Sequence, residues 1–300
     1  MDGIINLYKE RGFTSHDAVA KLRGIAKQKK IGHTGTLDPD AEGVLPVCLG
    51  YATKACGLLT DEDKTYKAVL LLGVTTDTQD MTGTVLERLP VTVDEQSVRE
   101  AIMSFAGVSQ QVPPMYSALK VNGKKLCDLA RRGIEVERSP RQINIYGIDI
   151  LGMALPEVTV RVRCSKGTYI RTLCHDIGQV IGCGGCMKSL VREAVGPFRI
   201  EDSITLKRLE ELASRGELES ALISADALFV RFPEVFASAA DAARLYNGNP
   251  VRAAGPDGTV RMYDHNGVFM GIYEQDGRTG AYKPVKLMAD TERLRRSLDL

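Results

Sequence analysis

The stretch Gly32-His33-Thr34-Gly35-Thr36-Leu37-Asp38-Pro39-Asp40-Ala41-Glu42-Gly43 is the feature around which the rest of the chain is organised. Its glycines permit positive φ angles or close backbone approach, and its polarity argues against the interior of a helix or strand. Pro39 fixes its own φ angle and restricts Asp38 to an extended conformation. A carboxylate at such a stiff corner has little entropy left to lose, which suits a catalytic acid, base or nucleophile.

Asp38 also has a purely structural interpretation, as the N-cap of a helix that begins at Pro39. Gly43 and Pro46 would interrupt such a helix almost at once. A basic segment leads into the loop, because the residues between Asp17 and Asp38 include lysines and an arginine but no acidic residue. At the level of this loop alone, a helix cap and a functional site near phosphates both remain open.

Length and composition are those of an ordinary soluble protein with room for two domains: 300 residues, 44% of them hydrophobic and 26% charged. The net charge of +1 does not exclude an RNA enzyme, because basic residues can be concentrated on one face. The first twelve residues lack the apolar core of a signal peptide, and no apolar run could span a membrane. Seven cysteines without a disulfide pattern indicate reduced thiols, so we expect a cytoplasmic protein.

The segment Cys183-Gly184-Gly185-Cys186 has C-x-x-C spacing, which is typical of a redox dithiol or of half a zinc site. No second C-x-x-C or histidine pair follows to complete four metal ligands. We therefore interpret it as a glycine turn flanked by two thiols and expect no metal there.

Residues 110–141 differ in character from the segments around them and form a candidate basic insertion. Pro113 and Pro114 predict a stiff loop, after which basic residues outnumber acidic ones. Basic side chains interleaved with apolar ones are typical of a surface that binds a phosphate backbone, and an ordinary amphipathic hairpin is the alternative. The residues that we assign to RNA binding are Lys124, Lys125, Arg131 and Arg132.

The character of the sequence changes again near Pro233. Asn266-Gly267 lies between two apolar runs and predicts a β-hairpin, and Asp276-Gly277 supplies a further turn. Several short strands in this region predict a small β-barrel. We therefore expect a catalytic domain at residues 1–232 and an RNA-binding domain with a polar tail at residues 233–300.

Two further side chains stand out on their predicted elements. Tyr66 lies at the start of a strand that continues through the buried run 68–73, so its ring could face the core or a site. Arg171 lies near the N-terminus of a predicted helix, where the helix dipole disfavours a cation. An arginine in that position is a reasonable partner for a nearby carboxylate.

With these residues in view, the chain resembles the bacterial tRNA pseudouridine-55 synthases. The matching pieces, in the family's order, are His33-Thr34-Gly35-Thr36-Leu37-Asp38-Pro39, Lys64-Thr65-Tyr66, Gln111-Val112-Pro113-Pro114-x-Tyr116-Ser117-Ala118-Leu119-Lys120, Lys166-Gly167-Thr168-Tyr169-Ile170-Arg171, Leu190-Val191-Arg192 and Gly196-Pro197-Phe198. They extend over nearly the whole catalytic region. One departure is Gly185-Cys186, where many relatives have a small residue and then histidine.

The resemblance implies an α+β catalytic domain with a mainly antiparallel sheet flanked by helices, a central cleft, and a C-terminal PUA-like β-barrel. Such enzymes isomerise uridine 55 in the T-arm of tRNA to pseudouridine after flipping it out of the RNA loop. No metal or organic cofactor is implied. We expect a monomer that binds tRNA without an obligatory protein partner.

The resemblance also implies a role for each matching residue. Asp38 would be the catalytic carboxylate, which either attacks the nucleotide or abstracts a sugar proton. Arg171 would pair with Asp38, favour its ionised form and orient it. Tyr66 would stack on the flipped base and could take the C5 proton. The substrate-binding residues would be His33, supporting the distorted RNA loop, Leu190, forming a wall of the pocket, and Lys64.

Three rival interpretations remain. The Gly32-His33 pair could belong to a nucleotidyltransferase-like phosphate loop, although the usual His-x-Gly-His form is absent. The chain could be an RNA chaperone, with or without catalysis. It could also be a guide-RNA-dependent relative that needs partner proteins, but the long segment 110–141 favours a stand-alone bacterial-type enzyme.

Overall fold

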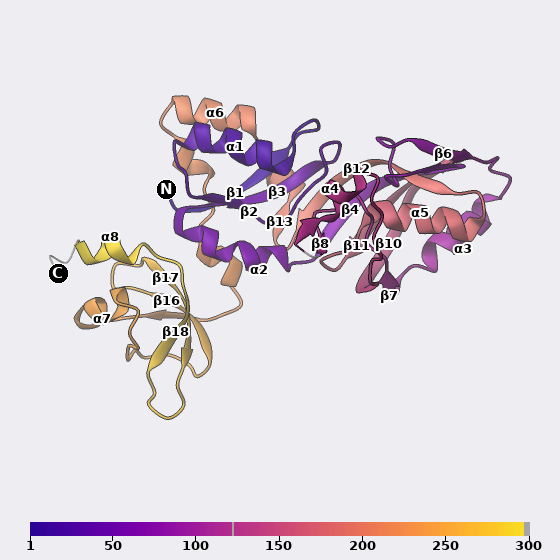
Figure 1. Ribbon diagram of the computed structural model, residues 1–300. Helices are drawn as coiled ribbons and strands as arrows, with labels where there is room; N and C mark the ends of the chain where they lie inside the picture. Colours follow the sequence, from indigo (N-terminus) through magenta and orange to yellow (C-terminus); the bar gives the residue numbers. More distant parts are fainter. Residues whose placement is uncertain (122, 297–300) are drawn as a thin grey trace.

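The computed structural model describes residues 1–121 and 123–296 (Figure 1). A large sheet extends through an elongated N-terminal domain, and a smaller C-terminal domain lies beside one end of it. Helices pack against the large sheet along its length. The expected α+β architecture is therefore confirmed.

The large sheet has the strand order β14-β1-β3-β12-β4-β11-β10-β7. Its strands are β14 (Ile204–Thr205), β1 (Gly3–Lys9), β3 (Glu42–Leu49), β12 (Gly185–Val195), β4 (Lys64–Leu72), β11 (Glu157–Cys164), β10 (Arg141–Ala154) and β7 (Gly107–Gln111), with β2 (Ile31–His33) beside β3 and β13 (Phe198–Arg199) beside β12. Two pairs are parallel, β1 with β14 and β3 with β12, and the other pairs are antiparallel. A separate two-stranded sheet pairs β5 (Val74–Thr76) with β6 (Val85–Arg88).

The two halves of the large sheet join where β3 and β12 run in parallel for a short stretch. The paired residues are Val191 with Glu42 and Arg192 with Gly43. Gly43 has a φ angle of 108°, and a Cβ atom there would lie 2.3 Å from the Arg192 carbonyl oxygen, so only glycine fits. The loop 34–41, which leads into this join, is thereby placed at the centre of the sheet.

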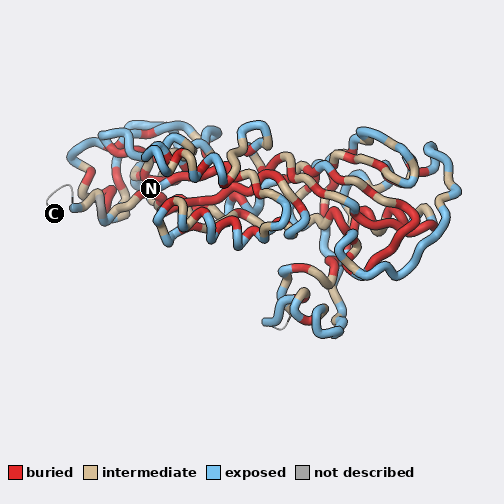
Figure 2. Tube along the Cα trace, turned by 90° about the horizontal axis from the view of Figure 1, so that it is seen from above, coloured by how far each residue is buried: buried red, intermediate tan, exposed pale blue. Residues whose placement is uncertain are grey.

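The helices are α1 (Ser15–Ala26), α2 (Cys56–Thr60), α3 (Glu95–Met103), α4 (Leu126–Ala130), α5 (Ile170–Ile181), α6 (Leu206–Ser214), α7 (Ala242–Tyr246) and α8 (Thr291–Arg296). The predicted start of α1 is confirmed, because Thr14 and Asp17 form a reciprocal capping box. Apolar residues of α1 and α6 pack on β1 and β3, whereas α3 and α5 pack on β4, β10 and β11. Figure 2 shows these buried segments as a band through the middle of the body.

The structure corrects the extent of the central loop. Gly32 and His33 belong to β2, and Glu42 and Gly43 begin β3, so the irregular part is residues 34–41. Glycine is admitted in a strand where another group approaches closely. That is the case at both glycines, because a Cβ atom at Gly32 would lie 3.2 Å from a neighbouring cysteine sulfur.

The basic insertion contains two short paired strands, β8 (Lys120–Val121) and β9 (Lys124–Lys125), followed by α4. Figure 2 shows it projecting from the main body, with much of its surface exposed. Its base is anchored on the sheet by β7 and β10, which pair across it. The insertion is therefore a separate arm whose two ends lie in neighbouring strands.

The C-terminal domain contains a sheet with the order β15-β16-β17-β18, formed by Glu234–Phe236, Thr259–Tyr263, Phe269–Gln275 and Tyr282–Leu287. The predicted hairpin at Asn266-Gly267 is confirmed, since it joins β16 to β17. Among the described strands, no pairing of β15 with β18 closes the sheet into a barrel. Residues 297–300 of the predicted polar tail lie outside the described part of the chain.

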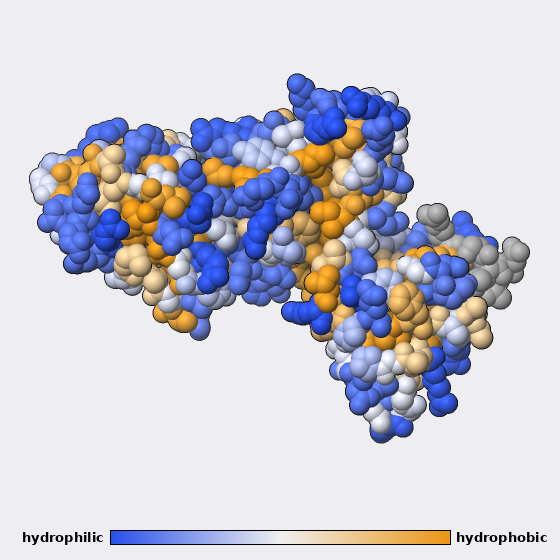
Figure 3. Space-filling view, turned by 180° about the vertical axis from the view of Figure 1, so that it is seen from behind, coloured by the Kyte–Doolittle hydropathy of each residue, from blue (hydrophilic) through white to orange (hydrophobic). Residues whose placement is uncertain are grey.

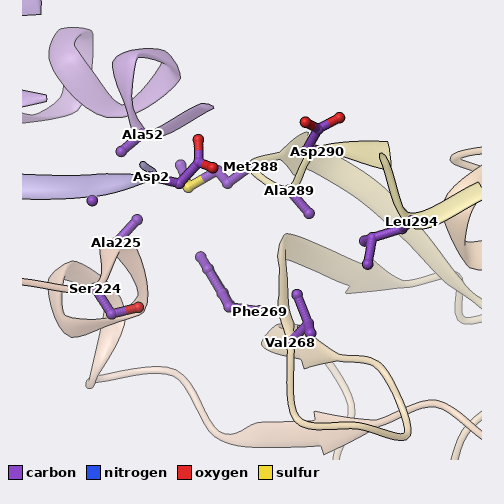
Figure 4. A pocket seen from close by; sticks show the side chains of 11 residues that line it. Asp2, Ala52, Ser224, Ala225, Val268, Phe269, Met288, Ala289, Asp290 and Leu294 are labelled. Carbon is purple, nitrogen blue, oxygen red and sulfur yellow. The ribbon is translucent and has the colours of Figure 1, made fainter. Parts of the chain in front are cut away.

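The two domains share a hydrophobic core. Ile272 and Met288 of the C-terminal domain pack in one cluster with Ile4 and Val44 of the large sheet. Beside this cluster lies a cavity of about 310 Å3, lined from both domains (Figure 4). In Figure 3, apolar side chains are visible where the C-terminal domain meets the body. A boundary near residue 233 stays a prediction, because the shared core links the two sides of it.

The segment between α5 and β12 is a turn, as the sequence predicted. Gly182 ends α5 in a left-handed conformation, and Cys183 donates to the Gly184 carbonyl at 3.4 Å. Cys186 lies instead against Met81, with 3.6 Å between the sulfurs, and all seven cysteines are free thiols. Over residues 1–121 and 123–296, no cluster of three or more histidine, cysteine or acidic side chains could hold a metal, and no helix is long and apolar enough to cross a membrane.

Candidate active site

The Asp38 loop is held in place by hydrogen bonds on both sides of the aspartate. The Leu37 amide donates to the Ser15 hydroxyl at 2.8 Å, which ties the loop to the start of α1. The Gly12 amide donates to the Pro39 carbonyl at 2.9 Å. Pro39 starts a tight turn and no helix, so the interpretation of Asp38 as a helix cap is wrong. Because the backbone is fixed on both sides, the Asp38 carboxylate has a defined position.

Arg171, at the start of α5, binds this carboxylate through two nitrogens. Its Nε lies 3.1 Å from one Asp38 oxygen, and its Nη2 lies 3.5 Å from the other. The guanidinium is itself fixed by the carbonyls of Tyr116 and Thr78, at 2.7 and 3.2 Å, and by Asp80 at 3.5 Å. Only 7% of the Arg171 side chain is exposed, so the arginine is rigid and presents one face to Asp38.

Burial and charge act in opposite directions on Asp38. The surrounding protein desolvates the carboxylate and raises its pKa, whereas the Arg171 guanidinium lowers it, and burial has the larger effect. Arg171 thus favours the ionised form, as expected, but the pKa of Asp38 still lies above its ordinary value. The side chain remains 41% exposed, which leaves a path for a substrate atom.

Tyr66 and Leu190 form a wall next to the loop. They lie on the neighbouring strands β4 and β12, where Tyr66 is paired with Arg192 and Leu190 with Ala68. Both side chains are buried and belong to the same hydrophobic cluster as Leu37 of the loop. The structure therefore brings together four residues named from the sequence: Asp38, Arg171, Tyr66 and Leu190.

His33 lies at the entry to the loop, and its Nδ1 is 3.0 Å from the Gly35 carbonyl. Burial lowers the pKa of this imidazole, which keeps it neutral at physiological pH. Its neutral ring can contact a nucleotide without introducing a charge into the site.

Lys64, which the resemblance assigns to substrate binding, contacts the preceding segment of the chain. Its ammonium is buried and donates to the carbonyls of Thr60 and Glu62, each at 2.6 Å. Burial lowers the pKa of Lys64 to about 8. An ammonium held by two carbonyls ties the start of β4 to the preceding helix, and a role of Lys64 in substrate binding stays a prediction.

The four basic residues of the insertion are exposed: Lys124, Lys125, Arg131 and Arg132. Arg131 lies 3.7 Å from Asp128, a surface ion pair that leaves the guanidinium accessible. The base of the insertion reaches the active centre, because the carbonyl that binds Arg171 belongs to Tyr116. Arg171 therefore contacts both the base of the insertion, through Tyr116, and the Asp38 carboxylate.

Asp80 has no role predicted from the sequence, and it lies on the other side of the Arg171 guanidinium from Asp38. One Asp80 oxygen accepts hydrogen bonds from the hydroxyls of Thr78 and Thr82, at 2.7 and 2.6 Å. The other lies 3.5 Å from Arg171. The only signal was a turn-rich loop at residues 77–83, and nothing in that loop indicates a partner on a distant helix.

Tyr169 and Lys9 also lie next to the site, although no role was predicted for them from the sequence. Burial raises the pKa of the Tyr169 phenol, and both Asp38 and Arg171 act on it electrostatically. Lys9 lies beneath the loop, where its ammonium donates to the Pro39 carbonyl at 3.3 Å and burial lowers its pKa to about 8. The sequence signal for Lys9 was a lysine at the end of a mainly apolar first strand.

Comparison with known proteins identifies one family over most of the chain. The family model for the N-terminal domain of TruB family pseudouridylate synthases matches residues 23–170. The model for the tRNA pseudouridylate synthase B C-terminal domain matches residues 171–229, and that for the C-terminal part of pseudouridine synthase II TruB matches residues 233–280.

Curated relatives cover the chain almost completely. The tRNA pseudouridine synthase B of Lachnoclostridium phytofermentans is 53% identical, over 96% of this chain and 99% of that protein. The same-named enzyme of Clostridium kluyveri is 45% identical, over 91% of this chain and 95% of that protein. In the crystal structure of a Cbf5-Nop10-Gar1 complex, one chain is 26% identical with a TM-score of 0.73, covering 97% of this chain and 86% of the other.

Fold, site and comparisons together define a pseudouridine synthase, which is an isomerase. More narrowly, the chain belongs to the TruB family of pseudouridine synthases.

Proposed function

We propose that this enzyme converts uridine 55 in the T-arm of tRNA to pseudouridine. The observation that supports this most strongly is the clamped Asp38–Arg171 pair at the join of the sheet, with a basic arm anchored to the same arginine. Relatives at 42–53% identity are named tRNA pseudouridine synthase B, which indicates tRNA as the substrate. We propose that the protein acts as a monomer in the cytoplasm and without a partner protein.

The reaction is an isomerisation, so atoms are rearranged and none is gained or lost. The bond from N1 of the base to the ribose breaks, a bond from C5 to the ribose forms, C5 loses a proton and N1 gains one. A uridine in a folded RNA loop must first be flipped out of its stack to reach Asp38. Asp38 then attacks the nucleotide or abstracts a sugar proton, and its ionised form is required in either case.

The other side chains orient the Asp38 carboxylate and the flipped base. Arg171 holds the carboxylate and compensates its charge, while Asp80 and two carbonyls keep the arginine in place. Tyr66 lies where its ring can stack on the flipped base and its hydroxyl can exchange the C5 proton. Leu190 and the neutral His33 complete the pocket by shape. All these roles are performed by side chains of the chain itself.

Release of the C5 proton gives a direct assay. A tRNA transcript made with uridine tritiated at C5 should lose about one tritium per molecule when incubated with the enzyme, because one uridine is isomerised. A transcript that carries cytidine at position 55 should release none. Equal release from both transcripts would show that the proposed site in tRNA is wrong.

The raised pKa of Asp38 predicts the acid limb of the activity. A carboxylate whose pKa lies above the ordinary value of about 3.9 is protonated sooner as the pH falls, and the protonated form can neither attack nor abstract a proton. We therefore expect the single-turnover rate to decline at a pH above that value. The rate should be measured at saturating tRNA, with binding followed over the same range. A rate that stays flat down to about pH 4 would contradict this prediction.

The basic arm predicts a particular dependence on salt. Each lost phosphate contact should flatten the plot of log affinity against log salt by somewhat under about one unit. Replacing Lys124, Lys125, Arg131 and Arg132 together by Gln should therefore weaken tRNA binding mainly at low salt and leave the rate at saturating tRNA nearly intact. A matched control replaces the exposed residues Lys21, Lys207, Arg208 and Arg215 of the α1 and α6 region by Gln.

Binding over a salt series decides the result. We expect a flatter slope for the arm variant than for the control variant, although both remove the same charge. Equal slopes for the two variants would mean that the arm is an ordinary amphipathic hairpin facing solvent.

A second activity, as an RNA chaperone, is compatible with the same surface. Its support is that Lys124, Lys125, Arg131 and Arg132 are exposed on a segment that projects from the main body. A catalytically inactive variant that still accelerates the refolding of tRNA would demonstrate it. A variant that binds tRNA but leaves its refolding rate unchanged would exclude it.

A further inference from the structure

Arg192 is a buried cation beneath the active-site loop to which the proposed function gives no role. Its side chain lies at the join of the sheet and is 1% exposed. Nε donates to the Val44 carbonyl at 2.7 Å, and Nη1 lies 3.5 Å from the Thr36 carbonyl. Nη2 is buried with no hydrogen-bond partner among the described residues. A buried guanidinium with an unused donor is unfavourable and calls for an explanation.

The group that faces Arg192 is Tyr66. The two residues are directly opposite each other on the antiparallel strands β12 and β4, so their side chains lie on the same face of the sheet. The positive charge of the guanidinium lowers the pKa of the Tyr66 phenol, and burial of the phenol raises it by more. Arginine keeps its charge at every physiological pH, so this interaction is permanent.

The other titratable groups around this pair do not replace Arg192. Those acting on Tyr66 are Arg192 on β12, Cys164 on β11 and Asp38 in the loop. Burial raises the pKa of Cys164 to about 12, which keeps that thiol neutral. Ionised Asp38 carries a negative charge, so it cannot stabilise a phenolate. The charge of Arg192 contributes to lowering the pKa values of Lys9, Lys64 and His33. The polar groups of these three side chains contact backbone carbonyls. Arg192 is therefore the cation that acts on the Tyr66 oxygen.

We propose that Arg192 is a positioning residue whose guanidinium stabilises the negative charge on the Tyr66 oxygen when Tyr66 serves as the base for the C5 proton. The inference rests on the proposed function and adds a specific device to it. The C5–H bond breaks, its electron pair restores the double bond of the base, and the proton forms an O–H bond on Tyr66. That proton then passes through water to N1 of the product, which regenerates the phenolate. The unused Nη2 donor is thus available for an anionic oxygen.

Removing the charge of Arg192 should make Tyr66 harder to ionise. Burial raises the pKa of Tyr66, and Arg192 acts against burial. Without the arginine, only the raising effects remain, so the phenolate fraction at a given pH falls. We expect the titration midpoint of Tyr66 in Arg192→Gln to rise by about one pH unit or more, which is about tenfold less phenolate. The rise of the single-turnover rate at alkaline pH, which reports formation of the Tyr66 phenolate, should move to higher pH by the same amount.

The test is a titration of Tyr66 in the RNA-free protein. The chain has 10 tyrosines, so 3-fluorotyrosine can replace all of them and the resonance of Tyr66 can be assigned by its loss in Tyr66→Phe. Fluorine NMR then follows the midpoint in wild type, Arg192→Gln and Arg192→Lys. Arg161→Gln is the matched control. Arg161 lies on β11, which neighbours the strand of Tyr66, and its guanidinium forms an ion pair with Glu193 of β12 at 2.6 Å. We expect a large rise for Arg192→Gln, a smaller rise for Arg192→Lys, which keeps a charge, and none for Arg161→Gln.

Wild type alone provides a comparison that does not depend on how a variant folds. Tyr273 is another buried tyrosine, its hydroxyl has no hydrogen-bond partner among the described residues, and burial alone raises its pKa. Tyr66 should therefore ionise before Tyr273 as the pH is raised. Tyr66 ionising together with or after Tyr273, or an unchanged midpoint in Arg192→Gln, would overturn the proposal. Both measurements are made without RNA, so an enzyme that proved inactive on tRNA would leave their outcome unaffected.

Discussion

Asp38→Asn should abolish pseudouridine formation and leave the affinity for tRNA within about an order of magnitude of wild type. The amide has the shape of the carboxylate and can still accept a hydrogen bond from Arg171. It can neither attack the nucleotide nor take a proton from the sugar. Binding should persist because phosphate contacts dominate the affinity for nucleic acid, and the basic arm is unchanged. Single-turnover tritium release and filter binding measure the two effects separately.

Asp40→Asn is the matched control for this variant. Asp40 lies two residues further along the same loop and is exposed, and its backbone carbonyl, not its side chain, binds Arg11 at 3.2 Å. We expect this variant to retain most of the activity. Substantial turnover by purified Asp38→Asn would remove Asp38 from its role, whereas equal inactivity of both variants would point to damage of the loop rather than loss of a catalytic group.

Tyr66→Phe should slow the chemical step by about 100-fold or more while changing tRNA binding little. Phenylalanine keeps the ring that can stack on the flipped base and loses only the hydroxyl. Tyr66→Ala should weaken binding as well, because stacking of a base on an aromatic ring contributes about 1–3 kcal/mol. Rates and affinities of the two variants therefore separate the proton-transfer role from the stacking role.

Tyr146→Phe serves as the control for loss of a tyrosine hydroxyl. The Tyr146 hydroxyl donates to Asp63 at 3.0 Å on an exposed part of β10, and its removal should not affect turnover. If Tyr66→Phe turned over as fast as wild type, the ring alone would matter. Neither the proton transfer by Tyr66 nor the role of Arg192 would then hold.

The position of the Asp38 loop could be predicted from the sequence because its signal is local. Asp38-Pro39 between glycines is stiff wherever it occurs, and the matching segments around Tyr66, Arg171 and Leu190 occur in the family's order. Elements with strong periodicity or caps were also predictable, such as α1 with its capping box and the hairpin at Asn266-Gly267. These features depend on residues that are neighbours in the chain.

Features that depend on distant partners could not be predicted. Asp80 meets Arg171 across 91 residues, and Arg192 faces Tyr66 only because β12 lies beside β4 in the sheet. The fold also buries the Lys64 ammonium against two carbonyls, and the sequence did not indicate these contacts. The pKa of Asp38 likewise depends on how far the surrounding walls exclude water, and a sequence alone gives no measure of that burial.

The most direct measurement of the central claim is a chemical map of pseudouridine along an unmodified tRNA transcript after incubation with the purified enzyme. Wild type should produce a single strong signal at position 55, and Asp38→Asn should produce none while still binding the transcript. The same map with Asp40→Asn should match wild type. A signal at other uridines with none at position 55, or no signal at any uridine with wild-type enzyme, would contradict the assignment.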